Sequence, residues 1–265
     1  MPELPEVEAA RRRLEAGIVG RKIVSAEAIH DPVVFRGITG RRLAAALVGR
    51  RVKSIRRKGK HLWFELDRRP WPAFHFGMTG SFAIYDAPDE RPRFWRLEVV
   101  FAGGTRIAFR DPRRFGRIRL QDDPANEPPI SLLGADPLLE PPSARDLRGL
   151  LACRRAPLKA VLLDQSVFAG VGNWVADEIL YQARLSPIRP ASSLTAAEVG
   201  RLRSALLSVV KRAVRVEADS DRFPRAWLFH TRWGRTAGAI TSRGEAITHA
   251  TVGGRTTAWV PTRQK

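Results

Sequence analysis

The stretch QDDPANEPPISLLGADPLLEPPS, residues 121–143, separates two parts of the chain whose hydrophobic patterns differ. Proline and acidic residues dominate this stretch, which is typical of a linker. Short β-prone segments precede it, whereas apolar residues recur at helical spacing after it. The sequence therefore predicts a β-rich part followed by a helical part.

The part before the linker begins with an amphipathic helix and continues as strands. Val7, Ala10, Leu14 and Ile18 follow helical spacing, so we expect a helix over residues 5–18. Segments rich in β-branched and aromatic residues then occupy residues 22–28, 52–57, 61–66, 73–76, 81–85, 97–101 and 105–109. This pattern predicts a β-sandwich with a leading helix.

The part after the linker is predicted to be mainly helical, with a β-hairpin at its end. Helical spacing marks residues 145–153, 158–164, 174–183 and 196–216. Thr195 and Glu198 form a capping box that begins the last of these helices. The predicted fold class is α+β. Its parts are the β-sandwich over residues 1–128, the linker over 129–143, the helical domain over 144–230 and the hairpin over 231–265.

The net charge of +19 over 265 residues points to a polyanionic partner. A basic surface kept for solubility, or a codon bias toward arginine, explains part of this excess but not its clustering. The stretch GRRVKSIRRKGKH, residues 49–61, holds a run of Lys and Arg without one acidic residue. Such clusters indicate contact with phosphates, so nucleic acid is the predicted partner.

The sequence offers no sign of a membrane segment, a metal site or a cofactor. No apolar run approaches the ~18 residues that a membrane helix needs, and the beginning lacks the form of a signal peptide. Cys153 is the single cysteine, and the five histidines are scattered. We therefore expect no metal and no cofactor. The expected location is the cytoplasm, in a bacterial nucleoid, or the nucleus of a eukaryote.

Three short stretches carry candidate chemistry. In FAGVGNWVADEIL, residues 168–180, two glycines precede a helix near Asn173, which is either an anion site or only a turn. In FRDPRRFGR, residues 109–117, a turn presents Phe115 among arginines, as a wedge for a base stack or as a core residue. In HFGMTGS, residues 75–81, Met78 lies in a glycine-flanked loop or in the core.

The first residues of the chain, PELPEVE, are only partly explained by helix capping. Pro5, Glu6 and Glu8 suit the first turns of a helix, where proline fits and the helix dipole favours acids. Pro2 and Glu3 lie before the helix. If Met1 is removed, Pro2 becomes a secondary amine with a pKa near ~8, partly unprotonated at neutral pH.

Taken together, six stretches resemble the formamidopyrimidine-DNA glycosylase and endonuclease VIII family, in the family's order along the chain. They are PELPEVE (2–8), KGKH (58–61), HFGMTGS (75–81), DPRRFG (111–116), PLKAVLLDQSVFAGVGNWVADEILY (157–181) and GGRTTAWVPTRQK (253–265). The resemblance implies an N-terminal catalytic β-sandwich, a helix–two-turns–helix domain and a C-terminal finger. It also implies base-excision repair: removal of an oxidised base, then cleavage at the abasic site.

The resemblance implies a role for each catalytic residue. Pro2 attacks C1′ of the damaged nucleoside and forms a Schiff base, after which β- and δ-elimination cut the strand. Glu3 is the general acid/base, and Glu6 supports it. Lys60 binds a phosphate beside the lesion and assists elimination, and Arg255 is the arginine of the finger that contacts DNA.

Five further residues are implied to bind DNA. Met78, Arg113 and Phe115 fill the gap left by the flipped nucleotide, and Lys159 and Asn173 bind phosphates. The implied partner is damaged double-stranded DNA, bound by a monomer. The alternative is a catalytically silent DNA-binding or architectural protein on the same fold, since a fold does not guarantee a function.

The chain departs from the family at its finger. The cysteines that would hold zinc are missing, and the last two ligand places are Val260 and Arg263. We therefore expect a zincless finger, a hairpin held by packing of Ile240, Ile247, Val252 and Trp259. Phe94 also stands where many members have a DNA-contacting histidine.

The segment FPRAWLFHTRWGR spans residues 223–235. The stretch before it is too short to resemble the loop that caps 8-oxoguanine in other members of the family. Formamidopyrimidines are the expected substrates because both branches of the family share them. Oxidised pyrimidines, hydantoins and 8-oxoguanine remain open.

Overall fold

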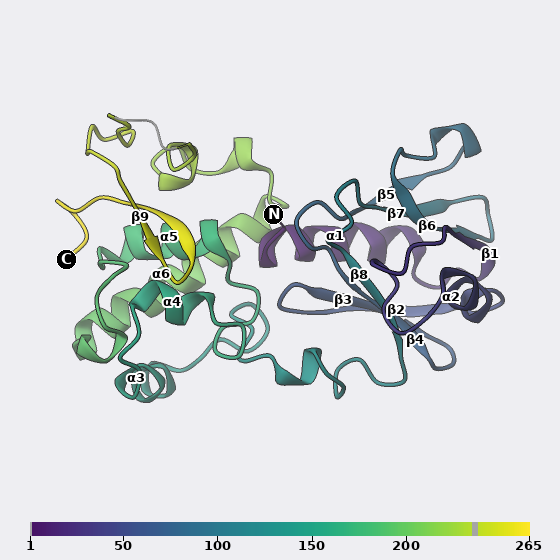
Figure 1. The fold of residues 1–265 in the computed structure, drawn as a ribbon, viewed down its shortest axis with the longest axis horizontal. Helices are drawn as coiled ribbons and strands as arrows, with labels where there is room; N and C mark the ends of the chain where they lie inside the picture. Colours follow the sequence, from purple (N-terminus) through teal and green to yellow (C-terminus); the bar gives the residue numbers. More distant parts are fainter. Residues whose placement is uncertain (1, 235–237) are drawn as a thin grey trace. The chain divides into compact units, whose positions relative to one another are not determined.

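The computed structural model describes residues 2–234 and 238–265. The chain forms two compact units, shown in Figure 1. The first contains Pro2 and residues 6–132, and the second contains Glu3–Pro5 and residues 133–265. Of the residues described, no helix is both long and apolar enough to cross a membrane.

The first unit is built on two four-stranded antiparallel sheets. One sheet has the order β1-β6-β7-β5 and the other the order β2-β3-β4-β8. The strands are β1 (Ile23–Ala28), β2 (Val52–Lys58), β3 (His61–Leu66), β4 (Trp71–His75), β5 (Ser81–Tyr85), β6 (Trp95–Phe101), β7 (Arg106–Arg110) and β8 (Arg117–Gln121). The β-sandwich predicted from the sequence is confirmed, with β8 as a strand that the prediction missed.

Alternating apolar residues bury one face of each sheet in a shared core. Phe64, Phe74, Phe101 and Phe109 are almost fully buried there. Helix α1 (Leu4–Ile18) adds Val7 and Leu14 to this core, which confirms the predicted leading helix. A second helix, α2 (Gly40–Leu47), was not predicted; Thr39 caps its first turn by accepting a hydrogen bond from the Arg42 backbone N–H.

The second unit is mainly helical, as predicted. Its helices are α3 (Ala144–Ala152), α4 (Leu158–Leu163), α5 (Asn173–Ala183) and α6 (Ala196–Arg215). The capping box of Thr195 and Glu198 is present at the start of α6. Helix α5 is buried along most of its length, with Asp177 and Glu178 buried among its apolar residues. It therefore forms the centre of the unit.

The hairpin of β9 (Thr248–Val252) and β10 (Arg255–Trp259) lies in the second unit. Ile247 and Val252 are buried as predicted, but Ile240 is 55% exposed, so its predicted packing role is wrong. The reason is that the core below the hairpin is filled by other residues: Tyr181, Leu228, Ala258 and Val260.

Polar contacts hold the hairpin region where the family resemblance would place zinc. Tyr181 and Thr241 both donate hydrogen bonds to the Glu245 carboxylate, at 2.7 Å and 3.1 Å. Arg263 forms an ion pair with Glu245 at 3.3 Å, and its guanidinium lies over the Tyr181 ring. Among the residues that the structure describes, no three His, Cys, Asp or Glu side chains are grouped as metal ligands. Val260 and Arg263 thus contribute packing and charge at these positions.

Candidate active site and nucleic-acid interface

Glu3 is buried at the N-terminus of helix α5. Its side chain is 1% exposed, and its two carboxylate oxygens accept hydrogen bonds from the backbone N–H groups of Trp174 (3.0 Å) and Val175 (3.1 Å). These N–H groups are unpaired within the helix, and the helix dipole favours an anion at this end. The anion site considered for the glycine stretch therefore exists, but its anion is a carboxylate of the chain itself.

Gly172 makes this arrangement possible. A Cβ atom at Gly172 would overlap the carboxyl group of Glu3. The backbone beside it is also fixed, since the Leu4 N–H donates a hydrogen bond to the Gly170 carbonyl oxygen at 3.1 Å. The glycines before α5 thus allow Glu3 and Leu4 to pack closely against the backbone at the start of this helix. Pro2, which is half-buried, directly precedes the fixed carboxylate.

Lys60 lies in the turn between β2 and β3, and a buried ion pair shapes that turn. Arg57 donates a hydrogen bond to the Glu8 carboxylate at 2.9 Å and another to the Gly59 carbonyl oxygen at 3.0 Å. The side chains of Arg57 and Glu8 are 1% and 6% exposed. Glu8, which the sequence analysis treated only as a helix-capping acid, therefore positions the backbone beside Lys60. Glu6 is half-buried, two residues before Glu8 in α1.

Burial alone would raise the pKa of Glu8, but hydrogen bonds from Arg11 and Arg57 hold it below its ordinary value. The carboxylate thus stays charged in the folded protein.

Two neutral histidines lie beside Lys60 on neighbouring strands. His61 on β3 pairs with His75 on β4, and their ring centroids are 4.7 Å apart. Burial, followed by the charges of neighbours that include Lys60 and Arg119, lowers the pKa of His61 to about 3 and that of His75 to about 4. His75 Nδ1 accepts a hydrogen bond from the Gly77 N–H at 3.2 Å. The neutral ring therefore helps to fix the start of the loop that carries Met78.

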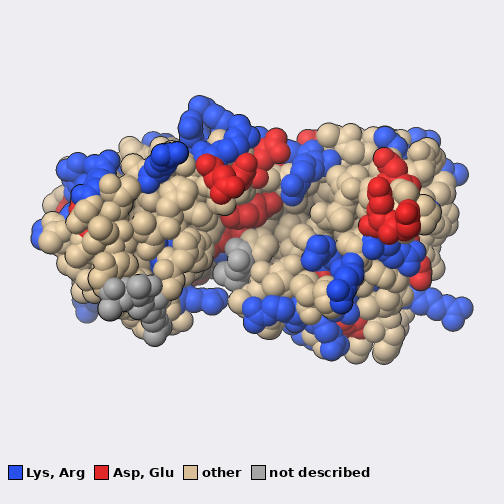
Figure 2. All heavy atoms as spheres, turned by 90° about the horizontal axis from the view of Figure 1, so that it is seen from above, with Lys and Arg blue, Asp and Glu red and all other residues tan. Residues whose placement is uncertain are grey.

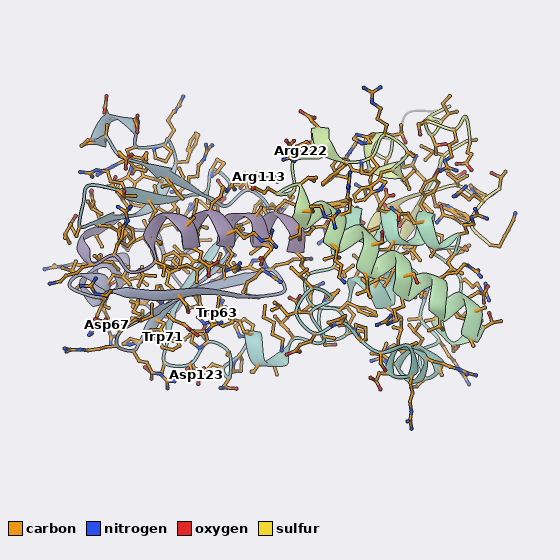
Figure 3. The ribbon with its side chains drawn as sticks, turned by 180° about the vertical axis from the view of Figure 1, so that it is seen from behind. Trp63, Asp67, Trp71, Arg113, Asp123 and Arg222 are labelled. Carbon is orange, nitrogen blue, oxygen red and sulfur yellow. The ribbon has the colours of Figure 1, made fainter. Side chains whose placement is uncertain are left out.

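Met78 and Phe115 are both exposed, on two loops of the first unit. Their exposed fractions are 38% and 41%, so the alternative that they fill the core is wrong. The Arg113 guanidinium lies 4.9 Å from the centre of the Phe115 ring. A Cβ atom at Gly77 would overlap the Phe115 carbonyl group, so the two loops are in backbone contact. The structure thus brings the three predicted gap-filling residues together; Figure 3 labels Arg113.

Lys159 is fully buried and does not reach the surface as a phosphate-binding residue would. Its ammonium lies 2.6 Å from the Asp177 carboxylate and donates hydrogen bonds to the Thr256 carbonyl oxygen (3.1 Å) and to the Thr257 hydroxyl (2.8 Å). Burial lowers the pKa of Lys159, and the Asp177 charge opposes that shift. The predicted phosphate contact does not fit this environment. Lys159 instead anchors strand β10.

Asn173 and Arg255 are linked through the same strand. The Asn173 side-chain amide donates a hydrogen bond to the Thr256 carbonyl oxygen at 3.0 Å. Arg255, the preceding residue, is exposed at the beginning of β10, after the Gly253–Gly254 turn. Asn173 and Lys159 therefore hold the backbone that presents Arg255 to solvent.

Asp177 is the functional residue of this region that sequence reasoning missed. It also accepts hydrogen bonds from Arg232 (2.6 Å) and from the Ala258 N–H (3.2 Å). The available signal was a pair of acidic residues, Asp177 and Glu178, on a helix most of whose other residues are apolar. Such a buried charge needs a partner, which pairing with Lys159 and Arg232 supplies.

The exposed cations give the surface a basic character. Figure 2 shows Lys and Arg in several patches on the visible face, with the acidic residues gathered in a few groups. Phe94, at the place of the family's histidine, is 49% exposed with a positive φ of 62°. A phenyl ring there cannot donate the hydrogen bond of an imidazole.

Comparison with known proteins supports the resemblance seen in the sequence. The model of the formamidopyrimidine-DNA glycosylase N-terminal domain matches residues 1–118, and that of the formamidopyrimidine-DNA glycosylase H2TH domain matches residues 133–224. The chain belongs to the formamidopyrimidine-DNA glycosylase and endonuclease VIII family. It is a DNA glycosylase with lyase activity at abasic sites and acts in DNA repair.

Two relatives match this chain over its whole length. A formamidopyrimidine-DNA glycosylase of Arabidopsis thaliana is 41% identical, covering 100% of this chain and 71% of the relative. One from Thermus thermophilus is 38% identical, covering 100% of this chain and 98% of the relative. The Lactococcus lactis enzyme bound to DNA with an abasic site has a TM-score of 0.87 and 28% identity, covering 99% of both chains.

The buried pair of Glu8 and Arg57 generates a stability prediction. Replacing Glu8 with Gln removes the negative charge beside the buried Arg57 guanidinium, and we expect the free energy of unfolding to fall by about 3 kcal/mol. The control is Glu15→Gln, which removes an exposed pair with Arg11 and should change it by less than about 0.5 kcal/mol. Chemical denaturation at pH 7 measures both. Equal effects of the two variants would contradict the role given to Glu8.

The lowered pKa of His75 predicts a dependence of stability on pH. The unfolded chain takes up a proton at this residue near pH 6.5, whereas the folded chain does so only near pH 4. The free energy of unfolding should therefore fall as the pH drops from 6.5 to 4. In His75→Asn, which keeps an acceptor for the Gly77 N–H, the slope should lessen by about 1.4 kcal/mol per pH unit. An unchanged slope in denaturation curves would contradict this.

Proposed function

We propose that the glycosylase excises oxidised bases from duplex DNA through a Schiff base on the amine of Pro2, formed after removal of Met1. The observation that carries the proposal is the Glu3 carboxylate, fixed by two backbone N–H groups of α5 next to Pro2. The Pro2 nitrogen forms a bond to C1′ as the bond to the damaged base breaks; the base leaves with the bonding electrons and takes a proton from water. Glu3, the next residue, accepts the proton that the nitrogen loses.

Glu3 is proposed to move protons in both directions. Its carboxylate, held by the backbone N–H groups of α5, first accepts a proton from Pro2. It then gives that proton to O4′ of the sugar as the ring opens and the Schiff base forms. A positioned acid/base of this kind contributes about 10²–10⁴ in rate. β-Elimination and then δ-elimination release the two phosphates around the sugar.

Lys60 and Arg255 are proposed to bind phosphates. Half-buried Lys60 lies in the turn between β2 and β3, and exposed Arg255 begins β10; a buried ion pair supports the backbone beside each of them. Lys60 would also assist elimination. We propose that Met78, Arg113 and Phe115 occupy the space left by the flipped nucleotide, since aromatic and aliphatic wedges offset the cost of unstacking. The proposed parts are residues 1–128, the linker 129–143, the DNA-binding domain 144–230 and the zincless finger 231–265.

Formamidopyrimidines are the proposed principal lesions, with oxidised pyrimidines, hydantoins and 8-oxoguanine as further candidates. The named function of the curated relatives supports the first. Solved structures of the Lactococcus lactis enzyme with DNA containing FAPY-dG, and of MutM with carbocyclic 8-oxo-G DNA, have TM-scores of 0.86 and 0.87. The excision rates of these lesions, each placed opposite each of the four bases, would rank the candidates. The enzyme is proposed to act as a monomer.

Borohydride trapping tests the proposed mechanism. Protein shown by mass spectrometry to lack Met1 is incubated with duplex DNA containing an abasic site, and the covalent adduct is measured. We expect full trapping by the natural chain and a loss of about 100-fold or more in the rates of Pro2→Gly and Glu3→Gln. Glu15→Gln, an exposed change on the same helix, should trap normally.

Two outcomes would overturn the proposal. Pro2→Gly with unimpaired trapping would remove Pro2 from the mechanism. Binding of the DNA without any adduct, by protein that lacks Met1, would instead identify a catalytically silent DNA-binding protein. Thermal unfolding of each variant separates loss of chemistry from loss of the fold.

A further inference from the structure

The loops that carry Met78 and Phe115 are joined by one buried carboxylate. Asp111, at the end of β7, is fully buried. Its Oδ1 accepts hydrogen bonds from the Thr79 hydroxyl at 2.6 Å and from the Arg113 N–H at 3.3 Å. Its Oδ2 accepts a hydrogen bond from the Gly116 N–H at 2.6 Å. Thr79 belongs to the Met78 loop, whereas Arg113 and Gly116 flank the tip of the other loop.

The outer side of the Phe115 loop is clamped as well. Arg96 donates hydrogen bonds to the Asp111 carbonyl oxygen at 3.1 Å and 2.9 Å. Arg114 forms two hydrogen bonds, each of 3.0 Å, with the buried Asp31 carboxylate. Arg114 also has a positive φ of 57°, a conformation that a residue with a side chain keeps only when its surroundings hold it. The loop is therefore held in one shape on both sides.

We propose that Asp111, acting through Thr79, is a positioning residue that locks the two loops into a single rigid element for insertion into DNA. Asp111 is too deeply buried to touch DNA, so it acts only through the residues that it holds. The Thr79 hydroxyl links this carboxylate to the Met78 loop. This inference rests on the proposed function of Met78, Arg113 and Phe115.

Rigidity matters here because opening a base pair has a cost. Unstacking and unpairing a nucleotide costs a few kcal/mol, which contacts in the vacated space must offset. Each side chain that is ordered only on insertion adds to that cost. Loops that are already joined avoid it, so Met78 and Phe115 enter the stack together. Without the hydrogen bond from Thr79, we expect the excision rate to fall only on DNA in which a base opposite the lesion must be separated from it.

Thr79→Val tests the proposal because it removes the hydroxyl and keeps the shape of the side chain. Thr79→Ser restores the hydrogen bond. The matched control is Thr105→Val, which removes the hydrogen bond that the Thr105 hydroxyl accepts from Arg21 elsewhere in the same unit. Asp111→Asn is a second variant; if it fails to fold, Thr79→Val still decides the outcome.

Two duplexes provide the readout under single-turnover conditions. In one, the lesion is paired with a base; in the other, the opposite position holds an abasic analogue that the lyase cannot cleave, so no base is orphaned. Thr79→Val should excise the lesion about tenfold more slowly from the paired duplex, as expected for a lost hydrogen bond to a charged group. On the second duplex its rate should stay within about twofold of the natural chain. Thr79→Ser and Thr105→Val should match the natural chain on both.

A 2-aminopurine opposite the lesion reports insertion directly, and its fluorescence rise should slow in Thr79→Val. Normal excision by Thr79→Val from the paired duplex would overturn the inference. An equal loss on both duplexes would also overturn it, because it indicates a general structural effect. Failure of the natural chain to form a trapped adduct would instead count against the proposed function.

Discussion

The hydrogen bonds between Glu3 and the first backbone N–H groups of α5 are the interaction on which the candidate site depends. They fix residues at the beginning of the chain to a helix that begins 170 positions later in the sequence. A buried carboxylate needs partners that replace water, and the free N–H groups of a helix end supply them without a second charge. Gly172 leaves the space for this contact. Pro2 is placed as a consequence, because one peptide bond joins it to Glu3.

A buried carboxylate also fixes the backbone at three other places, in two of them through an ion pair. Glu8 holds Arg57, which fixes the backbone beside Lys60. Asp177 holds Lys159, which fixes the backbone beside Arg255. Asp111 binds the loop of Arg113 through backbone N–H groups. In each case the buried acid supports a turn that presents a cation, so acidic residues of a strongly basic chain organise its contacts with a polyanion.

The fold was largely predictable because its signals are local. The change of pattern across residues 121–143, the spacing of α1 and the capping box of α6 all act over a few residues. Helix α2 and strand β8 were missed, because α2 is short and β8, with Arg117 and Arg119 among its five residues, lacks the β-prone composition used as a signal. The roles that the motifs imply for Glu3, Lys60 and Arg255 stay predictions. The assignment of Lys159 to phosphate binding failed, because burial depends on Asp177 and Thr256, which are distant in sequence.

Substitution of Gly172 by Ala tests the account most directly. The new Cβ atom would displace the Glu3 carboxylate from the α5 N-terminus, while φ of −123° at this position suits alanine. The measurement is the single-turnover rate of lesion excision, with Gly149→Ala, whose Cβ would meet no neighbour, as the control. The account predicts a loss of about 100-fold or more for Gly172→Ala, with its thermal unfolding still cooperative, and a normal rate for the control. Excision by Gly172→Ala at the natural rate would contradict it.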